Sequence, residues 1–300
     1  MPPSPASLRQ AILQTIAYAD IFDYPLTAAE IHRYLIRVPA ALDTVVDALS
    51  NGLLAPDEMA RRGEYFTLPG REGLVETREQ RARLSARLWP LAVRYGRAIA
   101  GLPFVRMVAL TGALAVDNSR TDDDLDYLIV TESGRLWTCR AWVILLVHLV
   151  ARSGVVICPN YFLSENALAL DDRSLFTARE LAQMVPLSGL SVYHHMRQVN
   201  AWADALLPNA HGPPRPDVPA TRPRAPLRPL AETLLRTPPG DWLERWEMSR
   251  KITKFTRLHP HTNETHFSPD RCQGHFDGYR AKTLAAFDER VKLVGTRGDS

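Results

Sequence analysis

The chain has 300 residues, a net charge of +3 and 23% charged residues. This length is enough for two domains with a sizeable core, and the near-balanced charge excludes both an intrinsically disordered chain and a protein that holds nucleic acid by bulk charge alone. The three cysteines, Cys139, Cys158 and Cys272, are widely separated and lack the spacing of a metal site, so a reducing cytoplasm is the simplest setting.

Neither the N-terminus nor the most apolar segment has the pattern of an export or membrane signal. The first five residues, Met-Pro-Pro-Ser-Pro, do not resemble a signal peptide. The most apolar run, residues 141–151, is interrupted by His148 and is too short to cross a bilayer. We interpret this run as a buried helix, and we expect a cytoplasmic protein with no membrane partner.

Residues 1–70 are predicted to form a winged-helix-like module. Apolar residues within 8–17 keep the spacing of one helix face. Thr27 is followed three residues later by Glu30, which is the pattern of a capping box and predicts the start of a second helix.

A third helix is expected over residues 39–50, and a hairpin is expected over 53–68. Three helices followed by a hairpin is the winged-helix pattern. The residues expected on the buried side of the third helix are Leu42, Val45, Val46 and Leu49.

The charges of this module are unfavourable for DNA binding. A helix that enters the major groove needs basic residues to meet phosphates, but the third helix carries Asp43 and Asp47 and no Lys or Arg. Arg61 and Arg62 in the expected hairpin are the only local cations. Protein contact or packing within the chain is therefore favoured over nucleic-acid binding.

The most informative pattern lies at residues 108–130. An apolar strand runs into Gly112, a short helix-like piece follows, and a polar loop leads to a second strand that carries Asp124 and Asp126. Because strand side chains alternate, the two aspartates share one face, about 6.5–7 Å apart along the backbone. Two aspartates alone are also typical of an acidic turn before a buried strand, but the full ordered set favours a functional site.

These residue types suit a metal-bound phosphate. Two neighbouring carboxylates repel each other, and a divalent cation such as Mg²⁺ or Mn²⁺ removes the conflict while also holding substrate phosphates. A carboxylate pair of this kind holds metals that activate an attacking oxygen and steady a leaving pyrophosphate. Gly112 lets the backbone approach a ligand closely, so Thr111, Gly112 and Ala113 are the candidate phosphate-binding residues.

This stretch resembles the signature of the polymerase-beta-like nucleotidyltransferase superfamily, in which an apolar residue, Gly and then Gly or Ser precede an Asp-apolar-Asp motif. Here the motif is Thr111-Gly112-Ala113 and Asp124-Leu125-Asp126, and Ala113 departs from it by lacking a hydroxyl. The segment 20–27 is similar to the start of winged-helix modules fused to bacterial nucleotidyltransferases. The resemblance implies an NTP substrate, a bound Mg²⁺ or Mn²⁺, and a small mixed sheet with flanking helices.

The same resemblance implies a third catalytic acid on a later strand. The next strand candidate is residues 155–165, where Glu165 is the only carboxylate and Asn160 occupies a place where an acid would fit. We therefore predict Glu165 as the third catalytic residue beside Asp124 and Asp126. If this acid is missing, deprotonation of the acceptor would be weakened, and the domain would bind nucleotide without turning it over.

The remaining segments complete an α+β arrangement. Helices are expected over 72–101, 176–184 and 193–207, which places a nucleotidyltransferase domain at residues 71–210. Residues 211–300 are predicted to be a linker rich in Pro and Arg followed by a helical segment. Trp242 and Trp246 lie among basic residues there. This pattern suits nucleic-acid stacking, but we favour an amphipathic helix that docks its Trp face on the core.

The sequence thus leaves two hypotheses of different classes. The first is a metal-dependent nucleotidyltransferase that moves a nucleoside monophosphate from an NTP to an acceptor such as a protein hydroxyl, a small metabolite, an antibiotic or an RNA end. The second is a winged-helix regulator or binding protein whose nucleotidyltransferase fold senses nucleotide or is degenerate. The intact Asp124 and Asp126 favour the enzyme, whereas Ala113 and the unsettled identity of the third acid favour the binding protein.

Overall fold

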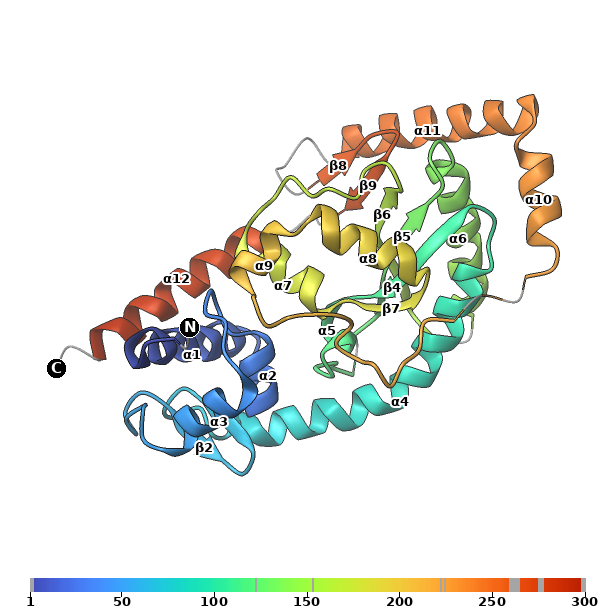
Figure 1. The fold of residues 1–300 in the computed structure, drawn as a ribbon. Coiled ribbons are helices and arrows are strands. Elements are labelled where there is room, and N and C mark those ends of the chain that lie inside the picture. Colours follow the sequence, from blue (N-terminus) through green and yellow to red (C-terminus); the bar gives the residue numbers. More distant parts are fainter. Residues whose placement is uncertain are drawn as a thin grey trace.

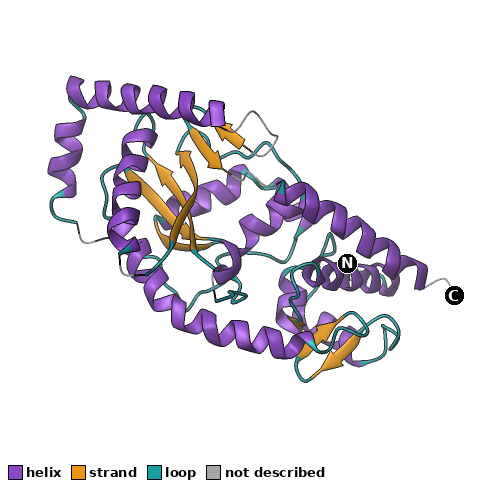
Figure 2. Ribbon diagram, turned by 180° about the vertical axis from the view of Figure 1, so that it is seen from behind, coloured by secondary structure: helices purple, strands orange, loops and turns teal. Residues whose placement is uncertain are grey.

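A six-stranded mixed sheet lies at the centre of the molecule, between two layers of helices (Figures 1 and 2). It is seen in a computed structural model that describes residues 3–121, 123–152, 154–221, 223, 225–258, 265–274 and 278–297. The strand order is β7-β4-β5-β6-β9-β8, and every pair is antiparallel except β5 and β6. The strands are β4 (Val105–Leu110), β5 (Leu125–Thr131), β6 (Ile157–Ser164), β7 (Val185–Ser188), β8 (Thr265–Phe267) and β9 (Arg271–Gly274).

The alternation of side chains along β5 divides the core into two layers. Leu125, Tyr127 and Ile129 pack into one layer, while Leu128 and Val130 pack into the other. The chain is therefore an α+β protein, as the sequence predicted. Asp124 and Asp126 share the face of β5 that carries Leu128. They therefore lie on the side of the sheet that the second layer covers.

Different helices cover the two faces of the sheet, as the core clusters show (Figure 1). The first face is covered by α4 (Leu74–Ala100), α6 (Leu136–Ala151) and α11 (Pro238–Leu258). The second face is covered by α7 (Leu175–Gln183), α8 (Leu190–Val199) and α9 (Trp202–Leu206). The remaining helices of this part are α5 (Gly112–Ala115), α10 (Arg228–Leu235) and α12 (Tyr279–Arg297).

The N-terminal part is a bundle of three helices beside a small three-stranded sheet of order β1-β3-β2. The predicted capping box is confirmed, because Thr27 and Glu30 exchange both hydrogen bonds. The prediction that Leu42 and Val46 face inward is wrong, since these side chains are 42% and 40% exposed. The elements are α1 (Pro5–Asp20), β1 (Leu26–Thr27), α2 (Ala28–Arg33), α3 (Leu42–Ser50), β2 (Ala60–Arg62) and β3 (Tyr65–Thr67).

Helix α4 joins this N-terminal part to the sheet (Figure 1). A buried arginine fixes the junction. Arg78 of α4 is 6% exposed and donates to the carbonyl of Asp117, to the Tyr24 hydroxyl and to Glu30. The Tyr24 hydroxyl in turn donates to the carbonyl of Val116, at 2.7 Å. The loop that follows α5 is therefore held by groups from two separate parts of the chain.

The C-terminal segment adds two strands to the central sheet and one helix that packs on the N-terminal part. Strands β9 and β8, which the sequence did not predict, extend the sheet beyond β6. Helix α12 runs beside α1 in both ribbon views (Figures 1 and 2). Between the two helices, Arg290 pairs with Asp20, and the rings of Phe287 and Tyr18 meet edge to face at 5.5 Å.

Two of the sequence-based expectations about helix faces are wrong. Trp242 and Trp246 of α11 do not dock on the core: they are 59% and 48% exposed and stack on each other, because α11 packs through a different face. Helix α6 connects β5 to β6 but is only half buried, since Trp142, Leu145 and Leu149 point outward. None of the helices formed by the described residues is long and apolar enough to cross a membrane.

We predict that replacing Arg78 with alanine destabilises the fold by about 3 kcal/mol, because it leaves Glu30, the Tyr24 hydroxyl and the Asp117 carbonyl without their buried partner. Urea unfolding at pH 7 measures the change. The matched control is Arg83→Ala on the same helix, whose exposed pair with Glu79 contributes less than about 1 kcal/mol. Equal effects of the two substitutions would contradict this account of the junction.

Candidate metal and phosphate site

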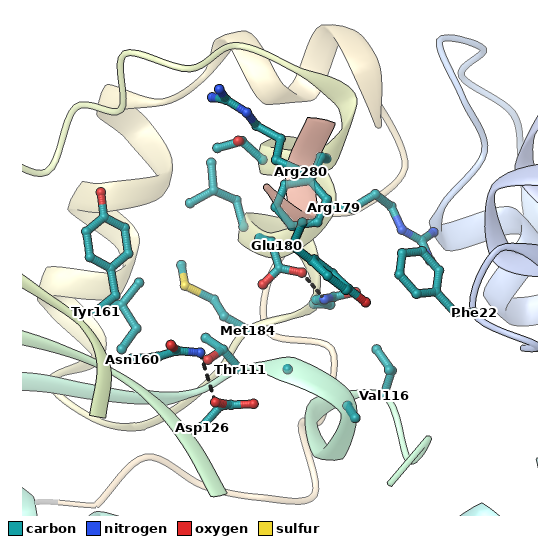
Figure 3. Close-up of a pocket in the computed structure, with 18 of the residues that line it drawn as sticks. Phe22, Thr111, Val116, Asp126, Asn160, Tyr161, Arg179, Glu180, Met184 and Arg280 are labelled. Atoms are coloured by element: carbon teal, nitrogen blue, oxygen red, sulfur yellow. Dashed lines mark hydrogen bonds between the residues drawn. The ribbon is translucent and has the colours of Figure 1, made fainter. Parts of the chain in front are cut away.

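A cavity of about 1060 Å³ opens on the second face of the sheet. Its floor is formed by the starts of β5 and β6 and by the turn after β4, and α7 forms one wall. The end of α1 and the start of α12 close it from the side, so residues far apart in sequence line one space (Figure 3). All of the predicted phosphate-binding residues and both predicted metal ligands line this cavity.

Strand pairing brings together three metal-ligating groups, of which Asp124 and Asp126 line the cavity floor. Asp126 on β5 is opposite Cys158 on the parallel strand β6, and Asp124 lies just before β5. One ligand atom from each of these three residues lies within 4.8 Å of the other two. Among the described residues this is the one cluster with the composition and spacing of a metal site.

The electrostatics of this cluster are those of a site built for a cation. Burial, reinforced by the nearby charges of Asp124 and Glu180, raises the pKa of Asp126 to about 8. Burial and the same two aspartates hold the pKa of the Cys158 thiol far above its usual value. A divalent ion would reverse the sign of the local field and favour the deprotonated form of each group.

The turn at Gly112 makes room for the Asp126 carboxylate. The amide of Thr111 donates to the Asp126 carbonyl at 3.0 Å, which holds the turn against β5. Gly112 has φ of +68°, and a Cβ at this position would overlap the Asp126 carboxylate oxygen Oδ2. Glycine is thus required here for two reasons, its left-handed backbone and its missing side chain. Ala113 follows in the four-residue helix α5.

The predicted third acid is not part of this site. Glu165 lies after the far end of β6, where its amide donates to the carbonyl of Thr131. Thr131 is five residues along β5 from Asp126, which is about 16 Å at the rise of a strand. Because β5 and β6 are parallel, a residue beside Asp126 must come from the beginning of β6. Asn160 lies there and donates from Nδ2 to Asp126 Oδ1 at 2.8 Å.

Helix α7 supplies a carboxylate that the sequence did not single out. Glu180 lines the cavity, accepts a hydrogen bond from Gln183 at 2.6 Å and points toward Asp126 in Figure 3. Burial raises its pKa to about 7. The side chain is sheltered from bulk water yet partly accessible from the cavity. A carboxyl group with this pKa and position is suited to accepting a proton near neutral pH.

Comparison with protein-family models, with curated proteins and with solved structures finds no match for this chain. The chemistry of the site is therefore interpreted from its own residues: oxygen and sulfur ligands for one cation, a glycine turn beside them, and a separate buried carboxylate.

We predict that Gly112→Ala weakens Mn²⁺ binding at least about tenfold, because the added methyl group displaces the Asp126 carboxylate. Isothermal titration calorimetry measures the affinity. Gly134→Ala is the matched control, since Gly134 has φ of +69° but a Cβ added there would meet nothing within 4 Å. Equal affinities in both variants would show that the Gly112 turn does not shape the site.

The raised pKa of Asp126 also predicts a pH dependence of stability. Between its usual value of 3.8 and about 8, Asp126 keeps a proton in the folded chain that it has lost in the unfolded chain. This group therefore destabilises the metal-free fold increasingly as pH rises through that window. Relative to Asp126→Asn, the wild type should lose up to about 1.4 kcal/mol of unfolding free energy per pH unit. Urea unfolding in EDTA tests this, and a pH-independent difference would contradict it.

Proposed function

We propose that this chain is a metal-dependent nucleotidyltransferase, which transfers a nucleoside monophosphate from an NTP to a hydroxyl-bearing acceptor. The observation that carries the proposal is the meeting of Asp124, Asp126 and Cys158 beside the Gly112 turn, with both aspartates and the turn lining one cavity. This combination of a cation site and a close-approach turn suits a metal-bound triphosphate. The likeness of residues 108–130 to the polymerase-beta-like signature supports the same proposal.

Each residue of the site has a proposed role. Asp124 and Asp126 hold Mg²⁺ or Mn²⁺, whose chemistry is to polarise the triphosphate and stabilise the leaving pyrophosphate. Cys158 adds a softer ligand, which favours Mn²⁺ over Mg²⁺. Thr111, Gly112 and Ala113 form the turn against which the phosphates lie. Asn160 fixes the orientation of Asp126 through its amide.

Glu180 replaces Glu165 as the proposed proton acceptor. In the transfer step the acceptor oxygen forms a bond to the α-phosphorus, the bond from that phosphorus to pyrophosphate breaks, and the hydroxyl proton passes to Glu180. Its pKa of about 7 allows it to be ionised before the step and protonated after it. With the acid on α7, no carboxylate is needed at the β6 position that Asn160 occupies.

We also propose that the N-terminal part is a winged-helix module that acts in cis. Its order of helix, strand, helix, helix and hairpin supports this assignment. Acidic α3 is poorly suited to DNA, whereas the end of α1 lines the cavity and Arg78 ties the module to the turn region. The module is therefore proposed to complete the cavity and not to bind nucleic acid.

A second candidate function is a nucleotide sensor that binds NTP without turnover. Asn160 favours it, because an amide on β6 points at Asp126 where a third carboxylate on that strand would otherwise lie. Pyrophosphate release separates the two functions, since only the enzyme produces it.

We predict Mn²⁺-dependent release of pyrophosphate from at least one of the four NTPs when a small-molecule cell extract supplies the acceptor. Asp124→Asn and Asp126→Asn should abolish it, and calorimetry should show that they also lose Mn²⁺–NTP binding. Glu180→Gln should keep that binding but slow release by roughly 10²–10⁴-fold.

Glu165→Gln is the control for Glu180→Gln and should retain full activity, because it lies at the other end of β6. NTP binding without any pyrophosphate release would support the sensor. Unchanged Mn²⁺–NTP binding and pyrophosphate release in Asp126→Asn would contradict both functions.

A further inference from the structure

Arg179 of α7 is a buried cation without a salt bridge to any described residue, although the neighbouring Glu180 lies within range of its charge. The side chain lines the cavity and is 5% exposed, and its Nε is buried without a hydrogen-bond acceptor. It forms no hydrogen bond or ion pair with any described residue. Its contacts are with aromatic rings: the guanidinium carbon lies 3.7 Å from the Tyr34 ring centre and 5.1 Å from that of Tyr18.

This arrangement is costly unless an anion completes it. Stacking on tyrosine offsets only part of the free-energy cost of burying an unpaired charge. The other arginines of the cavity do not have this problem. Arg271 pairs with Asp171, Arg280 pairs with Asp172, and Arg120 is exposed to water.

The position of Arg179 separates it from the cation site. The charge of Glu180 raises the pKa of Asp126, and the charge of Arg179 lowers the pKa of Glu180. Figure 3 shows the same order, with Glu180 between Asp126 and Arg179 and with the Arg179 side chain reaching toward Phe22. A ligand that spans the cavity from the cation site thus passes Glu180 before it reaches Arg179.

We infer that Arg179 binds a phosphate or carboxylate group of the acceptor, so that the acceptor is a small hydroxylated anion. This inference rests on the proposed nucleotidyltransferase function. The NTP phosphates lie against the metal and the Gly112 turn, and the acceptor hydroxyl must reach Glu180 to lose its proton. The rest of the acceptor then extends toward Arg179. A guanidinium held over a tyrosine ring can still donate from its N–H edge to such a group in two parallel hydrogen bonds.

The first test measures binding of matched probes to the full chain in EDTA. Without a metal, the acids of the cation site offer an anion no positive charge, so an anion that binds must use a cation elsewhere in the cavity. Glycerol 3-phosphate and glycerate are the anionic probes, and glycerol is the neutral one. We expect at least one anion to bind at least about tenfold more tightly than glycerol, and the tighter anion identifies phosphate or carboxylate as the group. Equal binding of all three, or no binding of either anion, overturns the inference.

Variants assign the binding to Arg179. Arg179→Gln should weaken anion binding at least about tenfold, Arg179→Lys should retain part of it, and the control Arg120→Gln should leave it nearly unchanged. Thermal unfolding confirms that each variant is folded. If Arg179→Gln does not fold, Arg179→Lys takes its place, and wild-type anion affinity in that variant overturns the inference. Wild-type anion affinity in a folded Arg179→Gln would overturn the inference.

A final measurement distinguishes the acceptor from the NTP. Arg179→Gln should bind Mn²⁺–ATP with wild-type affinity to within about twofold, whereas a tenfold loss would assign Arg179 to the triphosphate and overturn the inference. Asp126→Asn should show the opposite pattern, losing Mn²⁺–ATP while keeping the anionic probe. If the wild type binds the anion but no Mn²⁺–NTP, the proposed function fails separately from the anion site.

Discussion

The carboxylate of Asp126 is held away from bulk water beside two other acids, and much of the structure around it depends on that constraint. Like charges at short range in a low dielectric must gain either a proton or a cation. The chain places Asp126 there at a cost to its own stability, with Gly112 leaving room for the carboxylate and Asn160 orienting it. Stability given up at one point in this way is typical of a functional site.

The cavity around this carboxylate exists only because distant segments meet. The sheet provides the floor of the cavity, α7 provides a wall, and the N-terminal module and α12 provide the side (Figure 3). Arg78 and Arg290 are polar links that hold these outer parts, one to the loop after α5 and the other to α1. Changes far from the metal ligands would therefore alter the shape of the site through these links.

Local patterns in the sequence predicted the local parts of the structure. The strand, glycine turn and Asp-x-Asp strand, the capping box and the long helix α4 each follow from residues close together in the chain. Cys158 and Glu180 were missed because one depends on the register of two parallel strands and the other on how α7 packs over the sheet. The placement of Glu165 beside the two aspartates was wrong for the same reason. Glu165 follows β6, which is the strand next to Asp126, but it lies at the end of β6 far from Asp126. A helical pattern likewise defines a face but not its partner, so the exposure of Trp242 and Trp246 was not foreseen.

The most direct test of the central claim is a crystal structure of the chain with Mn²⁺ and a non-hydrolysable NTP analogue, with anomalous scattering used to locate the metal. We expect an anomalous peak within about 2.0–2.6 Å of carboxylate oxygens of both Asp124 and Asp126. The phosphates should lie against the Gly112 turn. A peak elsewhere, or a nucleotide bound outside this cavity, would contradict the account.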